Sequence, residues 1–155
     1  MFHDYYLRIS HLFNRGLGRC HRPVAGRIPD RGDGMSNRVA ISLTTGLEDT
    51  EKVSVALLVA VAAAEAGRPT LIFVTKEAVR LTLPGVAVGT ACSGCPPIQE
   101  LLARYTAAGG RFLVCPLCLN AREIGGEPLL DNAEPGGTVQ LWEWIGPESA
   151  TTFSY

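Results

Sequence analysis

The chain has 155 residues, of which 46% are hydrophobic and 19% are charged. This composition predicts one packed domain and excludes disorder throughout the chain. The formal net charge of −1 gives no electrostatic reason to expect a nucleic-acid partner or a polybasic contact with a membrane. The longest apolar run, from Val53 to Ala64, is too short to span a bilayer, so we expect no transmembrane helix.

Residues 1–34 differ in composition from the rest of the chain. They contain all three histidines and six arginines but only three acidic residues, and their glycines and prolines follow no helical or strand period. We interpret this segment as a disordered extension or as a start assigned too early, and we favour a true start at Met35. Residues 35–155 are then the folded domain.

The composition of residues 35–155 narrows the chemistry that this part of the chain can perform. It has 8 basic and 12 acidic side chains, a net charge of −4, and no histidine. A Ser-His-Asp triad, a Cys-His pair and a histidine-ligated metal site are therefore excluded. Four cysteines remain, in two Cys-x-x-Cys pairs. Since the chain starts with no apolar secretory signal, we expect a cytoplasmic, reducing location, where such pairs are redox, carrier or metal groups more often than structural disulfides.

Strand-like and helix-like segments alternate along residues 35–155. Near-continuous apolar runs at 38–45 and 69–75 predict buried strands, and the Ala-rich segment between them predicts a buried helix with Asp49 or Thr50 as its cap. In chain order, the pattern then predicts a short helix at 76–83, a short strand at 86–88, an amphipathic helix at 97–108, a strand at 111–115, a short helix at 116–122, a loop at 125–137, a helix at 138–145 and a strand at 151–155. This alternation predicts a mostly parallel sheet with helices on both faces and functional groups after the carboxyl ends of its strands.

Cys115 and Cys118 lie where a predicted strand leads into a helix. Pro116 suits the first helical position, which makes Cys115 the N-cap and places Cys118 in the first turn. The helix dipole and unpaired amides would stabilise a thiolate there, and Arg122 would add positive charge. We predict that Cys115, Cys118 and Arg122 are the catalytic residues, with Cys118 as a resolving or second acceptor thiol. Two inert buried cysteines are the alternative.

The second pair, Cys92 and Cys95, raises another hypothesis. Nineteen residues separate Cys95 from Cys115, a spacing that occurs in four-cysteine zinc sites. If the strands before both pairs are parallel, the pairs open on the same edge of the sheet. A zinc site or a thiol-redox module made of Cys92, Cys95, Cys115 and Cys118 is therefore an alternative, although zinc ribbons use hairpins and a whole helix and strand intervene here. A non-catalytic oligomeric binding protein is a further alternative.

The domain resembles the DsrE/DsrF-like family, which includes the sulfur-relay DsrE and TusD proteins. The features that carry the resemblance, over about residues 39–155, are the first strand leading into 45–49, the Ala-rich helix ending at 66–67, the strand at 70–74 and the segment 108–115. The resemblance implies a three-layer α/β/α fold with a five-stranded parallel sheet, and a homo-oligomer.

The same resemblance implies a role for particular residues. Cys115 and Arg122 occupy the positions of the cysteine and arginine of the relay proteins, so Cys115 would accept sulfane sulfur as a persulfide and hand it on. The chain would then be a small cytoplasmic sulfur carrier or sulfurtransferase accessory protein with sulfur-donor and sulfur-acceptor proteins as partners. We expect no cofactor, except for zinc in the four-cysteine alternative, and neither nucleic acid nor membrane as a partner.

Overall fold

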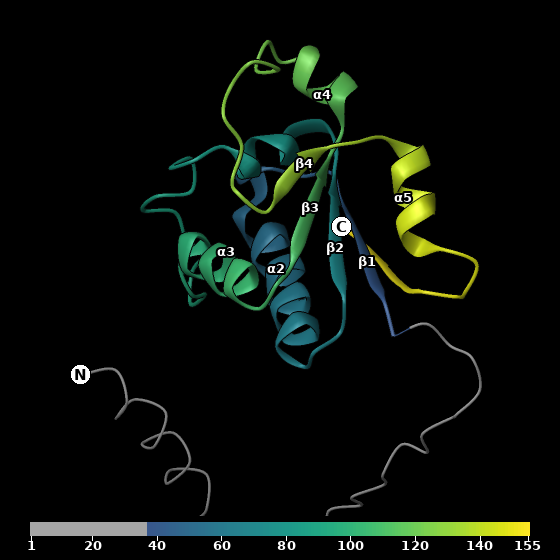
Figure 1. Cartoon of the computed structure of the whole chain (residues 1–155). Coiled ribbons are helices and arrows are strands. Elements are labelled where there is room, and N and C mark those ends of the chain that lie inside the picture. Colours follow the sequence, from purple (N-terminus) through teal and green to yellow (C-terminus); the bar gives the residue numbers. More distant parts are fainter. Residues whose placement is uncertain (1–36) are drawn as a thin grey trace, which may run out of the picture. The chain divides into compact units, whose positions relative to one another are not determined.

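Five parallel strands form one sheet in the order β4-β3-β2-β1-β5 (Figure 1). The computed structural model describes residues 37–155, so the predictions for residues 1–34 lie outside the described residues. The strands are β1 (Val39–Leu43), β2 (Thr70–Val74), β3 (Arg111–Val114), β4 (Ala133–Pro135) and β5 (Thr151–Ser154). The helices are η1 (Leu47–Asp49), α2 (Thr50–Glu65), η2 (Lys76–Thr82), α3 (Ile98–Ala107), α4 (Pro116–Asn120) and α5 (Thr138–Ile145).

The order of the strands explains how the helices form two layers. The chain moves outward from β1 to β4, with α2 and α3 as crossovers, and then returns through α5 to place β5 beside β1. Because crossovers between parallel strands are right-handed, reversal of direction puts α5 on the opposite face from α2 and α3. The predicted three-layer α/β/α fold is thereby confirmed (Figure 1).

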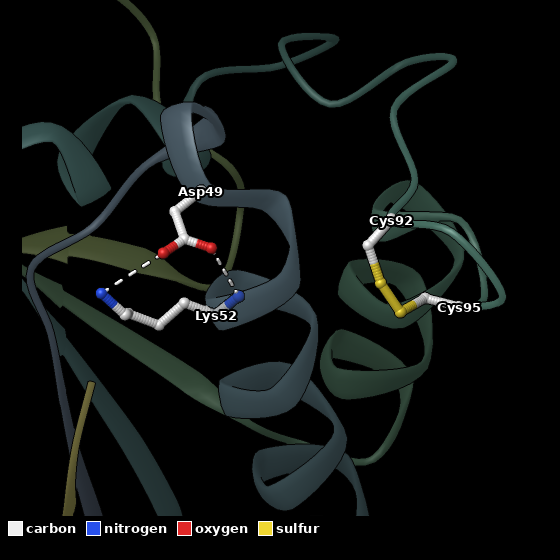
Figure 2. The surroundings of a disulfide bond; sticks show 4 residues. All are labelled: Asp49, Lys52, Cys92 and Cys95. Carbon is white, nitrogen blue, oxygen red and sulfur yellow. Dashed lines mark hydrogen bonds and ion pairs between the residues drawn. A yellow bond between two sulfur atoms is a disulfide. The ribbon is translucent and has the colours of Figure 1, made fainter.

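Helix α2 begins where the sequence predicts. One carboxylate oxygen of Asp49 accepts a hydrogen bond from the backbone N–H of Lys52 at 3.0 Å, and the other lies 3.3 Å from Lys52 Nζ (Figure 2). The backbone hydrogen bond is the main cause that lowers the pKa of Asp49.

Burial of α2 is confirmed on one side only, because Val55 and Leu58 are 43% and 41% exposed. Within the described residues, no helix is long and apolar enough to cross a membrane.

Two segments between the helices differ from their predicted structure. Residues 86–88 form turns instead of a strand, because Gly85 and Gly89 adopt φ values of +80° and +73° and reverse the chain on either side. The sheet still has five strands because the chain forms a strand that the sequence does not predict. This strand is β4, which lies inside the predicted loop 125–137. Its residues Ala133, Glu134 and Pro135 have no β-branched side chain, so no strand pattern marks it.

The buried ring of Tyr105 anchors α3 to the start of β3. Its hydroxyl lies 2.9 Å from the carbonyl oxygen of Thr70 and 2.8 Å from that of Arg111, and its ring meets Phe112 edge to face with centroids 5.1 Å apart. A Cβ atom built at Gly110 would lie 2.1 Å from a carbon of this ring. The close approach of the Tyr105 ring to the backbone at position 110 therefore requires glycine there.

We predict that Gly110→Ala lowers the free energy of unfolding by about 1–3 kcal/mol, the usual cost of overpacking a filled core. Gly126→Ala is the matched control, since a Cβ there would meet nothing within 4 Å, and we expect a change within about 0.5 kcal/mol. Urea denaturation followed by circular dichroism measures both. Equal stability of the two variants would contradict the contact with Tyr105.

Candidate functional site

The candidate site lies at the carboxyl ends of β2 and β3. The two strands pair in parallel with Val74 opposite Val114, and the backbone N–H of Cys115 continues the ladder by donating to the carbonyl oxygen of Val74 at 3.1 Å. The residues after each strand therefore leave the sheet side by side. Helix α4 begins at this edge after β3, and η2 begins there after β2 (Figure 1).

The start of α4 brings Cys115 and Cys118 together as the sequence predicts. Cys115 is the N-cap and Pro116 the first helical residue. The backbone N–H of Cys118 donates to the carbonyl oxygen of Cys115 at 3.1 Å. Both side chains are half-buried and pack against the hydrophobic core, while Leu117 between them is 79% exposed. One turn of chain thus presents two free thiols and one apolar side chain at the surface.

The sulfur of Cys118 has a hydrogen-bond partner from the neighbouring strand end. The backbone N–H of Lys76 donates to Cys118 Sγ at 3.2 Å. Lys76 adopts φ +49°, in the left-handed region that non-glycine residues seldom occupy. The only sequence signal for Lys76 is its position directly after a strand next to β3, so its role as a donor is not predictable from the motif around Cys115.

The pKa of Cys115 differs from the expectation. The pKa of Cys115 is raised, first because burial disfavours its thiolate and then because of its hydrogen bond to the side chain of Cys118. The amides of Cys118 and Leu117 lower this pKa, but by less. A helix N-terminus therefore does not by itself make Cys115 the charged member of the pair.

Arg122 is hydrogen-bonded to groups other than the two thiols. Its Nε donates to a carboxylate oxygen of Glu77 at 2.8 Å, and one of its terminal nitrogens donates to the backbone carbonyl of Cys118 at 3.2 Å. Its side chain is only 18% exposed. Glu77 also accepts from Arg80, and these two arginines, Arg80 first, lower the pKa of Glu77. Arg122 thus ties α4 to η2 and holds the backbone that carries Cys118.

Cys92 and Cys95 form a disulfide in the loop before α3 (Figure 2). Their Cα atoms are 5.2 Å apart, and the N–H of Cys95 donates to the carbonyl oxygen of Cys92 at 3.1 Å. Gly94 adopts φ +77°, as a tight turn with glycine at its third position requires. The turn is therefore held by its own backbone as well as by the sulfur–sulfur bond.

The alternative zinc site on all four cysteines does not form. Among residues 37–155, no group of three or more His, Cys, Asp or Glu side chains is arranged to hold a metal ion. Residues 86–88 are not a strand, so the Cys92 loop does not follow a strand of the sheet as Cys115 does. The two pairs are separate sites.

We predict that Arg122→Gln lowers the free energy of unfolding by about 1–2 kcal/mol, because a largely buried charge loses its hydrogen bonds. The pH at which Cys115 is alkylated should stay unchanged, since Arg122 contacts no thiol. Arg80→Gln, which removes a more exposed partner of the same carboxylate, is the control and should change stability by about 0.5 kcal/mol or less. A large shift in the alkylation profile of Cys115 in Arg122→Gln would show instead that its charge acts on the thiol.

Comparisons with known proteins agree with this fold. No match is found among curated proteins. The crystal structure of the YchN protein from E. coli is similar, with a TM-score of 0.64 and 24% sequence identity, over 76% of this chain and 98% of that one. The model of the DsrE/DsrF-like family matches residues 37–151, which is most of the chain and contains the whole site. The chain therefore belongs to the DsrE/DsrF-like family.

Proposed function

We propose that this protein is a small sulfur carrier, or an accessory protein of a sulfurtransferase, that holds sulfane sulfur as a persulfide on Cys115. The observation that carries the proposal is the half-buried Cys115 thiol at the N-cap of α4, with a second free thiol beside it. Burial raises the pKa of Cys115, and the amides of Cys118 and Leu117 act against this by favouring the thiolate that reacts. Family membership supports the same chemistry.

The proposed loading step exchanges one sulfur–sulfur bond for another. Cys115 Sγ attacks the terminal sulfur of a donor persulfide, and a bond forms between these two sulfurs while the sulfur–sulfur bond of the donor breaks. The proton of Cys115 ends on the donor thiolate that leaves. No net electrons enter or leave, so this transfer needs no cofactor. Transfer to an acceptor thiol is the same step in reverse.

The proposed partners are sulfur-donor and sulfur-acceptor proteins that contact the edge of the sheet around α4. Leu117 is exposed there. Helix α5 starts from the same edge, because β4 is the parallel neighbour of β3, and it exposes Val139 and Trp142. Exposed apolar side chains of this kind suit protein contacts, including those of a homo-oligomer. A cytoplasmic location is part of the proposal.

The persulfide predicts a gain of about 32 Da, one sulfur atom, on Cys115. The protein is reduced, incubated with glutathione persulfide, alkylated at once and digested for mass spectrometry. Cys115→Ser should abolish the gain, whereas Cys95→Ser should leave it unchanged. The proposal fails if no added sulfur is found on Cys115 either in the wild type or in a variant that lacks Cys118.

Thiol–disulfide exchange at Cys92 and Cys95 is a second candidate function, which the disulfide itself favours. Both side chains are half-buried, and Ser93 and Gly94 between them are exposed, so a partner thiol can approach. A bridge that closes only a four-residue turn constrains the unfolded chain little. The bond therefore adds little stability, which suits a bond that is made and broken.

This second candidate predicts selective labelling of the cysteines. Without reductant, iodoacetamide should modify Cys115 and Cys118 but neither Cys92 nor Cys95. After treatment with a reduced dithiol, all four should be modified, and the melting temperature should change little. A bridge that resists reduction until the protein unfolds would mark it as purely structural.

A further inference from the structure

The two free thiols of the site have different hydrogen-bond partners. Cys118 Sγ accepts the backbone N–H of Lys76 at 3.2 Å, and Lys76 holds this N–H in place from a left-handed conformation at φ +49°. Sulfur is a much better acceptor as thiolate than as thiol, so a fixed N–H favours negative charge on this sulfur. No such donor from outside its own helix faces Cys115 among the hydrogen bonds of the described residues.

The two thiols of the pair also lie close together, since the side chains of Cys115 and Cys118 hydrogen-bond to each other. In both Cys-x-x-Cys segments the N–H of the second cysteine donates to the carbonyl oxygen of the first at 3.1 Å. The Cys92–Cys95 segment carries a disulfide across this hydrogen-bonded turn. Cys115 and Cys118 have the same spacing and are both free.

We propose that Cys118, with its sulfur held by the Lys76 amide, discharges the persulfide of Cys115 and releases the sulfur as hydrosulfide. This proposal rests on the proposed persulfide on Cys115. It adds a chemical product to the carrier role and assigns the Lys76 amide as the group that stabilises the attacking thiolate.

The proposed step balances in atoms and electrons. The thiolate of Cys118 attacks the inner sulfur of the persulfide, so that the Cys115–Cys118 sulfur bond forms, the bond to the terminal sulfur breaks, and this sulfur leaves with the electron pair as hydrosulfide. The terminal sulfur is reduced, and the two cysteine sulfurs are oxidised to a disulfide. A reduced dithiol, by exchange, returns both cysteines to thiols and leaves as a disulfide.

The acid–base balance of the pair supports this assignment. After burial, the hydrogen bond and charge of Cys118 are the causes that raise the pKa of Cys115. Negative charge is therefore disfavoured on Cys115. Substitution of Cys118 by serine removes this cause, so the pKa of Cys115 should fall in the variant.

A single-turnover experiment on the full chain tests the step. Reduced wild type, Cys118→Ser and Cys95→Ser are loaded with glutathione persulfide and desalted, and released hydrosulfide is trapped with monobromobimane. Wild type and Cys95→Ser should release hydrosulfide and form the Cys115–Cys118 disulfide in equal amounts. Cys118→Ser should keep the added sulfur on Cys115.

The outcomes separate this inference from the carrier function. If wild type and Cys118→Ser hold the persulfide equally long, Cys118 does not discharge it and the inference is overturned, while the carrier function stands. If neither protein acquires sulfur on Cys115, the carrier function and the inference both fall.

The contribution of the amide is tested by two substitutions that both remove the lysine charge. Lys76→Gly allows the positive φ and keeps the N–H in place, whereas Lys76→Val disfavours this conformation. We expect Lys76→Val to release hydrosulfide about tenfold more slowly than Lys76→Gly, the effect of one hydrogen bond to a charged group. Equal rates in two variants with the same circular dichroism spectrum would overturn the role of the amide.

Discussion

The parallel pairing of β2 with β3 is the constraint on which the candidate site depends. Val74 lies opposite Val114, and the N–H of Cys115 extends the ladder by one further hydrogen bond. Because both strands end at the same level, the first residues of η2 and α4 are neighbours in space although about forty residues separate them in sequence. A slip in this register would move the Lys76 amide away from Cys118 and leave the thiols with local partners only.

Polar contacts fix the two strand ends to each other once the register is set. Glu77 accepts from Arg122, and Arg122 also donates to the backbone carbonyl of Cys118. The arginine that the family resemblance associates with catalysis therefore positions the helix that carries the thiols. This arrangement explains how a site without histidine differentiates two identical thiols: burial and the neighbouring thiol disfavour charge on Cys115, and an oriented amide favours it on Cys118.

The two cysteine pairs show that spacing alone does not define the environment of a sulfur atom. Both follow the Cys-x-x-Cys pattern and both have the same backbone hydrogen bond across the turn. Cys115 and Cys118 pack against the core at the end of a strand and are free, whereas Cys92 and Cys95 are oxidised in a loop bounded by turns. The proposed carrier chemistry belongs to the first pair and the proposed disulfide exchange to the second.

The sequence by itself determined what depends on neighbouring residues: the alternation of strands and helices, the cap at Asp49, the amphipathic helix α3, and the place of Cys115 before Pro116 at the start of α4. Tertiary structure decided what depends on residues far apart in the chain. Pairing with β3 makes β4 a strand despite its composition, and glycine turns prevent a strand at 86–88. Likewise, only the alignment of strand ends joins Lys76 to Cys118 and Glu77 to Arg122, because hydrogen bonds between distant residues follow from the register of the sheet.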